Sequence, residues 1–415
     1  MPTTYSYARL RALLTRLCLQ YYRFDPQRFP DVPSMVKAVA DLTGALVMPN
    51  IKPTSIATQD CAMCGLLGGS AGQATDGQAD DGLIDPTGAC GECLWAKRLK
   101  PYMFDQGITT YWLDDDETNK FAPKSALPPL PSPQVEVGED QRGHPPKSHA
   151  PRFRCGPTEF CGMWLAGKAW PQVFAQGVES EGGPAASKPL LLSRNAWAGA
   201  AAHGVALWSS DIPCSWKELN AQVSIGLSSG LSGIPFWSSD VGGFACGPSM
   251  PDPLERGGTL RQMPPPELVA RWHQFGSVSP LYRTHGDRFS NEPWSFGPEA
   301  EASIVKSIRL RTSLKSYIME LARNASAHGT PIMTPLWFFF PDDPELLRHE
   351  IVTTFMFGPR YLAAPVLELG ARNRTLYLPP NAGGWTHYYS RARFAGGANV
   401  TVSAPFDELP LFVRG

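Results

Sequence analysis

The chain has 415 residues, of which 43% are apolar and 12 are tryptophan, so it can bury the core of one large domain and a smaller one. Its formal net charge is −1 and it contains no blocks of lysine or arginine. The chain therefore lacks the concentrated basic face that a protein needs to bind nucleic acid. No apolar run reaches the ~18–20 residues of a membrane span. The first 20 residues lack the apolar core of a signal peptide, and the sequence leaves the compartment open.

In its first half the chain alternates helical patterns with short apolar runs that are typical of strands. The expected helices cover residues 35–42, 93–102, 169–177 and 216–227. The expected strands cover residues 45–51, 108–113, 189–194, 204–208 and 233–240. Such alternation indicates a parallel sheet. Because charged residues follow several of these strands, the pattern favours a (β/α) barrel over a doubly wound sheet.

Two aperiodic stretches interrupt this pattern. Residues 54–84 are rich in Gly, Ser, Ala and Asp, and residues 123–151 are rich in Pro, so both are expected to be loop insertions. From residue 337 the pattern changes to short β-like runs, which are separated by the turn sequences Asn381-Ala-Gly-Gly and Gly396-Gly-Ala-Asn. We therefore expect a small antiparallel sheet domain in this last part of the chain.

Four consecutive acids, Asp114 to Glu117, directly follow the expected strand at residues 108–113. The carboxyl end of a buried strand is where barrel enzymes hold their catalytic groups, so these carboxylates are candidates for chemistry. One alternative is a charged turn after a strand. Another is a divalent cation site formed by Asp115, Asp116 and Glu117, although neighbouring strand residues point to opposite faces and only alternate ones converge.

The nine cysteines include two pairs with the Cys-x-x-Cys spacing of zinc ligands, Cys61 with Cys64 and Cys90 with Cys93. A zinc knuckle is one hypothesis for these pairs. The other is that Cys90 and Cys93, at the start of an expected helix, pack as small apolar side chains.

Five ordered segments resemble signatures of glycoside hydrolase family 31, the α-glucosidases and α-xylosidases. Trp112-Leu-Asp114 is similar to the Trp-x-Asp segment of the family's nucleophile, and Trp208-Ser-Ser-Asp211 to the segment of its acid/base. The other three segments are residues 192–199, which resemble the family's arginine segment, and residues 233–244 and 271–286. The resemblance extends from about Phe24 to Gly415.

The resemblance implies an α/β fold, with an incomplete (β/α)8 TIM barrel at residues 1–336 and a small antiparallel β-sandwich at residues 337–415. The barrel is expected to be incomplete because family members carry a β-sandwich domain and further barrel strands before the segment that begins here at Phe24. Ser210 departs from the family pattern, since a glycine is usual before the acid/base residue.

A retaining glycosidase needs two carboxyls about 5–5.5 Å apart, one ionised to attack the anomeric carbon and one protonated to donate to the leaving oxygen. The resemblance assigns Asp114 as the nucleophile and Asp211 as the acid/base. A structural alternative for Asp211 is the N-cap of the helix that follows it. Arg194 is expected to bind sugar hydroxyls or to hold Asp114 ionised, and its alternative is a structural ion pair.

The resemblance also identifies residues that bind the sugar. These are Trp112, Arg194, Trp208, Asp240, Phe244 and His285. Asp240 and His285 are expected to hydrogen-bond the terminal sugar, and the aromatic residues to contact its faces. Trp237 and Trp272 are expected in the core. No metal or organic cofactor is implied, because the two carboxyls suffice for the reaction.

The implied function is hydrolysis of terminal non-reducing α-linked glucose or xylose in an oligosaccharide or glycoside, through a covalent glycosyl-enzyme intermediate. One alternative is a catalytically inactive remnant that binds carbohydrate. The other is a fragment of a longer enzyme, and both are motivated by the missing barrel strands. The sequence leaves the oligomeric state open, and also the choice between glucoside and xyloside.

Overall fold

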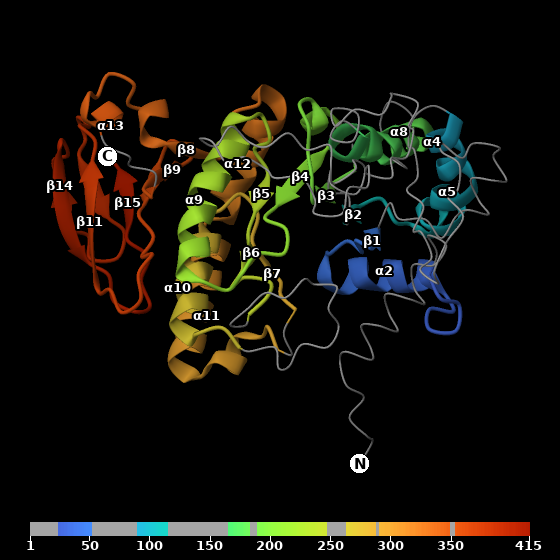
Figure 1. The fold of residues 1–415 in the computed structure, drawn as a ribbon, viewed down its shortest axis with the longest axis horizontal. Helices are drawn as coiled ribbons and strands as arrows, with labels where there is room; N and C mark the ends of the chain where they lie inside the picture. Colours follow the sequence, from blue (N-terminus) through green and yellow to red (C-terminus); the bar gives the residue numbers. More distant parts are fainter. Residues whose placement is uncertain are drawn as a thin grey trace, which may run out of the picture. The chain divides into compact units, whose positions relative to one another are not determined.

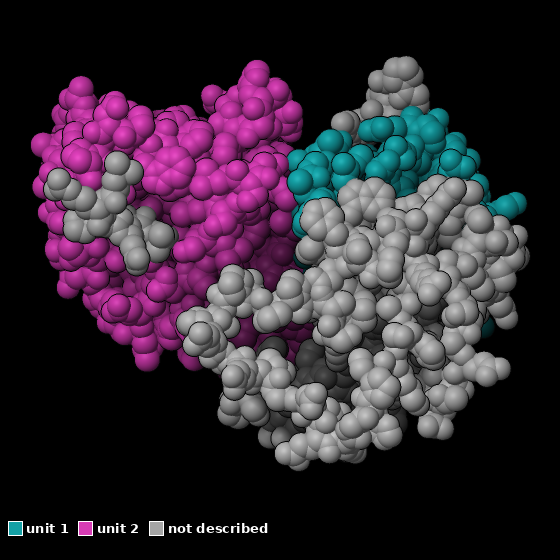
Figure 2. Space-filling view, turned by 45° about the horizontal axis from the view of Figure 1, so that its top comes forward, with its two compact units in different colours: residues 1–205 teal, residues 206–415 magenta. Residues whose placement is uncertain are grey.

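The computed structural model describes residues 24–51, 89–114, 165–182, 189–246, 263–287, 290–348 and 353–415. The chain forms two compact units, residues 1–205 and residues 206–415, which Figure 2 colours separately. Both expected loop insertions lie outside the described residues. So do Cys61, Cys64, Asp115, Asp116 and Glu117, and with them the proposed cation site and one of the two zinc pairs.

Short parallel strands form the sheet of the first unit. In sheet order they are β1 (Asn50–Ile51), β2 (Tyr111–Leu113) and β3 (Leu191–Ser193), as labelled in Figure 1. The parallel arrangement was predicted, but β1 is shorter than the expected strand at residues 45–51. The carbonyl of Pro49 accepts the N–H of Trp112 at 2.9 Å, yet proline has no N–H to donate, so regular pairing starts after it.

The described part of the first unit contains several helical segments, of which α2 (Val32–Thr43) has a clear cap at each end. The others are α4 (Ala89–Leu94), η1 (Trp95–Leu99), α5 (Lys100–Tyr102), η2 (Phe104–Gln106), η3 (Leu165–Ala169), α8 (Trp170–Gly182) and η5 (Ala200–His203). At the start of α2, the carboxylate of Asp31 accepts the N–H of Ser34 at 3.0 Å. At its end, Gly44 adopts a φ of 67° and donates its N–H to Ala40. The helix predicted at residues 35–42 is therefore confirmed.

Aromatic residues of α8 pack against the strands in the core of the first unit. The ring of Phe174 lies 5.2 Å from that of Trp170 and 4.9 Å from that of Tyr111 on β2, measured between centroids. Gly177, on the same helix, touches the indole of Trp95, and a Cβ at this position would overlap the ring. This close packing fixes β2 and, at its carboxyl end, Asp114.

The second unit continues the alternation of strands and helices. Its parallel pairs are β4 (Val205–Trp208) with β5 (Trp237–Ser238) and β6 (Asp240–Val241) with β7 (Arg283–Thr284); the first residue of β4 belongs to the first unit. Its longer helices are α9 (Trp216–Leu231), α10 (Pro266–Ser277), α11 (Pro298–Ser313) and α12 (Lys315–His328), and η6 (Pro293–Phe296) precedes α11. Trp237 and Trp272 are fully buried, which confirms their predicted place in the core.

Antiparallel strands form the last part of the chain, as predicted. One sheet has the order β13 (Arg393–Phe394), β12 (Trp385–His387), β15 (Leu411–Arg414), β10 (Tyr361–Ala363), β9 (Phe355–Phe357), β8 (Met333–Pro335), and a second pairs β11 (Asn373–Leu378) with β14 (Ala398–Ser403). The short helices η7 (Leu336–Phe338) and α13 (Glu345–Arg348) connect β8 to β9. Leu378 and Val402 of the smaller sheet share a core with Trp385 and Phe412 of the larger one, as in a β-sandwich. The domain boundary at residue 336 stays a prediction.

Arg271 ties α10 to this C-terminal part within the second unit. The side chain is fully buried, and its guanidinium donates hydrogen bonds of 3.0–3.1 Å to the carbonyls of Ala371, Ala404, Pro405 and Glu408. Burial lowers the pKa of Arg271 to about 10, but the side chain stays charged at neutral pH. One cation therefore satisfies carbonyls from two separate loops.

Replacing Arg271 with lysine should lower the free energy of unfolding by about 2–4 kcal/mol. Lysine keeps the charge, but its compact ammonium cannot reach all four carbonyls that the planar guanidinium of Arg271 contacts. Some of these buried acceptors therefore lose their donors. Chemical denaturation of the variant measures this loss. Arg309→Lys, an exposed position on α11, is the matched control, and equal stabilities of the two variants would contradict the role of Arg271.

Candidate active site

The strand ends of the first unit bring two polar side chains, those of Asn50 and Arg194, to the carboxylate of Asp114. Asp114 follows β2 and is 9% exposed. Its Oδ1 accepts a hydrogen bond of 3.0 Å from Nη1 of Arg194, which follows β3. Its Oδ2 accepts one of 3.0 Å from Nδ2 of Asn50 on β1. Parallel strands end at the same edge of a sheet, so neighbouring strands place these groups around one carboxylate.

The contacts of Asp114 stabilise its ionised form. A guanidinium and an amide each donate a hydrogen bond to a different carboxylate oxygen, and low exposure strengthens both interactions. An ionised, oriented carboxylate at the carboxyl end of a barrel strand is suited to attack an electrophilic carbon. The sequence predicted a contact with Asp114 as one of two roles for Arg194, but it gave Asn50 no role. The one feature of the sequence that could have pointed to Asn50 is its position as a polar residue near the end of the apolar run at residues 45–51.

Trp112 is the half-buried residue of β2, between the fully buried Tyr111 and Leu113. Successive strand side chains point to opposite faces, so Trp112 lies on the face opposite to the unit's packed aromatic core.

In the second unit, Asp240 pairs with Arg283. Asp240 is fully buried at the start of β6, and its Oδ1 accepts a hydrogen bond of 2.6 Å from Nη2 of Arg283 on the neighbouring strand β7. The guanidinium also lies 5.5 Å from the ring centroid of the buried Trp208. The backbone N–H of Asp240 donates to Oγ of Ser209 at 2.9 Å. Arg283 belongs to a segment that sequence reasoning recognised, but it was given no role there.

Phe244 and His285 lie against each other in the second unit. Their ring centroids are 5.3 Å apart, and the planes are inclined by 33°. The carbonyl of Phe244 also accepts the N–H of Asp287 at 2.8 Å, which fixes the two loops along the backbone. Two of the predicted sugar-binding residues therefore form one rigid pair, although they are far apart in the sequence.

Asp211 lies three residues after β4 and is half-buried. The N-cap of α9 is Ser215, whose hydroxyl accepts the N–H of Glu218 at 3.1 Å, so the N-cap alternative for Asp211 is wrong. The preceding residue, Ser210, has a φ of 65°. This left-handed conformation favours glycine, which explains in physical terms why a glycine is usual there in the resembled family.

Replacing Ser210 with valine should lower the free energy of unfolding by about 1–2 kcal/mol, because a β-branched side chain clashes in the left-handed region. Ser210→Gly is the matched control at the same position. There, relief of backbone strain offsets the greater freedom of the unfolded chain, so little change is expected. Urea denaturation of both variants tests this, and an equal loss in the two would show that the backbone conformation is not the cause.

Among the described residues there is neither a candidate metal site nor a membrane-spanning helix. These residues contain no group of three or more His, Cys, Asp or Glu side chains that could hold a metal ion. Cys93 is disulfide-bonded, and a disulfide sulfur lacks the thiolate charge that binds zinc, which argues against Cys93 as a zinc ligand. No helix in the same set of residues is long and apolar enough to cross a membrane.

Comparisons with known protein families identify both parts of the chain. Residues 6–321 match the family model described as "Glycosyl hydrolases family 31 TIM-barrel domain", and residues 329–415 match "Glycosyl hydrolase family 31 C-terminal domain". The predicted α/β fold class, with a barrel domain followed by a β-rich C-terminal domain, is confirmed by these matches and by the parallel and antiparallel strands.

Among individual proteins, some are similar to nearly the whole chain and others to about half of it. An alpha-xylosidase from Saccharolobus solfataricus is 29% identical over 401 residues, which are 95% of this chain and 48% of that protein. A probable glucan 1,3-alpha-glucosidase from Oryza sativa subsp. japonica is 33% identical over 56% of this chain and 23% of its own length. The crystal structure of a GH31 alpha-xylosidase from a soil metagenome, complexed with xylose, has a TM-score of 0.74 at 28% identity and covers 95% of this chain and 56% of its own. The chain thus spans about half the length of the alpha-xylosidase from Saccharolobus solfataricus, and its match covers less than a quarter of the rice protein.

Proposed function

The chain belongs to glycosyl hydrolase family 31, and on that premise we propose that it is a retaining α-glycosidase that releases a terminal non-reducing α-linked xylose or glucose. The observation that carries the proposal is the carboxylate of Asp114, which Arg194 and Asn50 hold by one hydrogen bond to each oxygen. A nucleophilic carboxylate has to be ionised and aimed, and these two contacts do both.

In the proposed reaction, an oxygen of Asp114 attacks the anomeric carbon while the bond from that carbon to the leaving oxygen breaks. Asp211 donates a proton to the leaving oxygen. In the second step Asp211 removes a proton from water, the water oxygen attacks the anomeric carbon, and the bond to Asp114 breaks. Each step inverts the configuration, so the product keeps the α configuration of the substrate.

The same proposal gives roles to the other predicted residues. Trp112, Trp208 and Phe244 contact the apolar faces of the sugar ring. His285, whose ring lies against that of Phe244, forms a hydrogen bond with a sugar hydroxyl. Asp240 was expected to bind the terminal sugar. Its burial and its pairing with Arg283 support a contact that includes the guanidinium, which would offer further donors to sugar hydroxyls.

The substrate class follows from the relatives. The relative and the solved structure that cover 95% of this chain are both named α-xylosidases, which supports a xyloside, and the rice relative supports a glucoside as the alternative. A xyloside lacks the hydroxymethyl group of a glucoside, so the discriminating contacts are those to the sugar's fifth carbon. Because the named relatives include both kinds of enzyme, both sugars stay in the proposal.

A proton NMR time course with an aryl α-xyloside and an aryl α-glucoside tests this function in the purified chain. The expected first product is the α-anomer of the released sugar, followed by slow mutarotation to the equilibrium mixture. Early appearance of the β-anomer would contradict retention. A cooperative melt without any turnover would favour the carbohydrate-binding remnant, and an insoluble chain would favour the fragment of a longer enzyme.

A further inference from the structure

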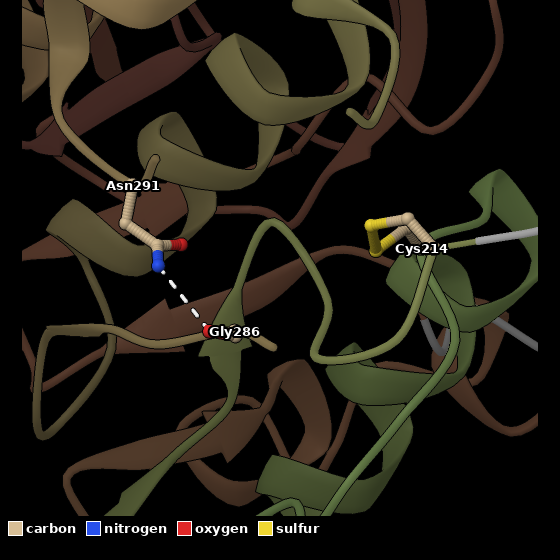
Figure 3. Close-up of a disulfide and its surroundings, with 4 residues drawn as sticks. Cys214, Gly286 and Asn291 are labelled. Atoms are coloured by element: carbon tan, nitrogen blue, oxygen red, sulfur yellow. Dashed lines mark hydrogen bonds between the residues drawn. A yellow bond between two sulfur atoms is a disulfide. The ribbon is translucent and has the colours of Figure 1, made fainter. Parts of the chain in front are cut away.

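A disulfide links two loops of the second unit that carry candidate site residues. Cys214 and Cys246 are joined with a Cα–Cα distance of 5.0 Å across 32 residues of sequence (Figure 3). Cys214 follows Asp211 by three residues, and Cys246 follows Phe244 by two. The bond therefore connects the loop of the proposed acid/base to the loop of a proposed sugar contact.

The two loops also touch along their backbones. The N–H groups of Phe244 and Ala245 both donate to the carbonyl of Ile212, at 2.7 and 3.2 Å, and Cys214 donates its N–H to Ala245 at 3.0 Å. Gly243 approaches so closely that a Cβ there would lie 2.7 Å from the Cα of Cys214. Such a contact leaves no room for either loop to shift toward the other.

The contact extends to a third loop. Asp287 donates its N–H to the carbonyl of Phe244 at 2.8 Å, and the ring of His285 lies against that of Phe244. In the same segment the carbonyl of Gly286 accepts a hydrogen bond of 3.3 Å from Nδ2 of Asn291, drawn as a dashed line in Figure 3. Asp211, Phe244 and His285 are thus carried by loops that form one connected platform.

Without a covalent bond this platform would depend on hydrogen bonds and packing around two adjacent glycines. Gly242 and Gly243 both have positive φ, at 93° and 79°, and adjacent glycines give a chain much conformational freedom. A cross-link removes that freedom. Both cysteines are half-buried, so neither residue is fully shielded from solvent.

We propose that the Cys214–Cys246 disulfide is a positioning device that holds Asp211 for catalysis by tying its loop to the loop of Phe244, so that turnover falls when the bond is reduced. The proposal rests on the proposed glycosidase function. A dithiol reductant supplies the two electrons: one of its thiolates attacks a sulfur of the bond, the mixed disulfide is resolved by its second thiolate, and the products are two cysteine thiols and the oxidised, cyclic reductant.

The test compares Cys214→Ser, Cys246→Ser and the double variant with the unchanged chain on two α-glycosides, one with a nitrophenol and one with a sugar as the leaving group. When the acid/base residue is displaced, the rate falls most for a substrate whose leaving group needs a proton. The expected result is a loss in kcat/KM of about 10- to 100-fold for the sugar leaving group, with a much smaller loss for nitrophenol. The three variants should match one another, because each breaks the same bond.

Dithiothreitol provides the second measurement, because it does not depend on whether a variant folds. It should reproduce the leaving-group effect in the unchanged chain. The double variant keeps the disulfide of Cys93, so its activity should not change with dithiothreitol if Cys214–Cys246 is the bond that matters. Folded variants whose two substrates lose kcat/KM equally, or an unchanged chain that keeps its activity after thiol titration confirms reduction, would overturn the proposal.

Hydrogen exchange separates this proposal from the proposed function. If the unchanged chain hydrolyses neither substrate, the glycosidase function fails, and the positioning role is still decided by the amides of Phe244 and Ala245. These amides should exchange faster in the double variant, whereas amides of the distant strand β11 should not change. Equal exchange of Phe244 and Ala245 in both proteins would overturn the positioning role by itself.

Discussion

Replacing Asp114 with asparagine should lower kcat/KM by more than about 10³-fold, because the amide has no negative charge with which to attack the anomeric carbon. The variant should still fold. Its single acceptor oxygen can satisfy either Arg194 or Asn50 but not both, so one hydrogen bond of the present geometry is lost.

Asp105→Asn is the matched control for this variant, since Asp105 is an exposed acid that pairs with Lys100. Steady-state rates on an aryl α-xyloside and an aryl α-glucoside compare the two proteins. Activity of Asp114→Asn close to that of Asp105→Asn would assign the nucleophile to another residue and would remove the observation on which the proposed function depends.

Replacing Asp211 with alanine should have the second largest effect, and that effect should depend on the leaving group. General acid catalysis contributes about 10²–10⁴-fold, so hydrolysis of a glycoside with a sugar leaving group should fall by that range. A nitrophenolate leaves without protonation, so formation of the glycosyl-enzyme should be much less affected. Azide needs no general base, and it should restore turnover of the nitrophenyl glycoside by attacking the intermediate.

The control for this variant is Asp342→Ala, an exposed acid in the second unit. Initial rates with both leaving groups, with and without sodium azide, provide the measurement. A uniform loss for the two substrates, with no rescue by azide, would contradict the assignment of Asp211 as the acid/base.

The helices could be predicted from local signals in the sequence. The helix expected at residues 216–227 is observed at Trp216–Leu231, and the one expected at residues 35–42 at Val32–Thr43. Both have caps that act over a few residues, Ser215 at one start and Gly44 at the other end. Signals of this range are readable without knowledge of the tertiary structure.

Strand lengths were less predictable, because an apolar run reports burial and not hydrogen bonding. The strand expected at residues 189–194 pairs only over Leu191–Ser193, and the one expected at residues 233–240 only over Trp237–Ser238 before β6 begins at Asp240. Pairing depends on the register with a neighbouring strand, which no single segment contains.

In the candidate site, too, some contacts could be predicted from the sequence and others depend on which strands are neighbours. Arg194 was predicted either to bind sugar hydroxyls or to hold Asp114 ionised, and it forms an ion pair with Asp114. Asn50 and Arg283 were not given roles, since what they bind is set by which strand lies beside theirs. The Cys214–Cys246 bond was also missed, because nine cysteines allow many pairings and the sequence does not choose among them.

The central claim is that Asp114 forms the covalent bond to the sugar. A fluorinated glycosyl fluoride tests it most directly, because fluorine at the sugar's second carbon slows the breakdown of a glycosyl-enzyme while the fluoride leaving group allows its formation. Peptide mass mapping after this treatment should find one sugar adduct, on the peptide that contains Asp114, and none in the Asp114→Asn variant. An adduct on Asp211 or another acid, or an unmodified chain that turns the reagent over, would contradict the account.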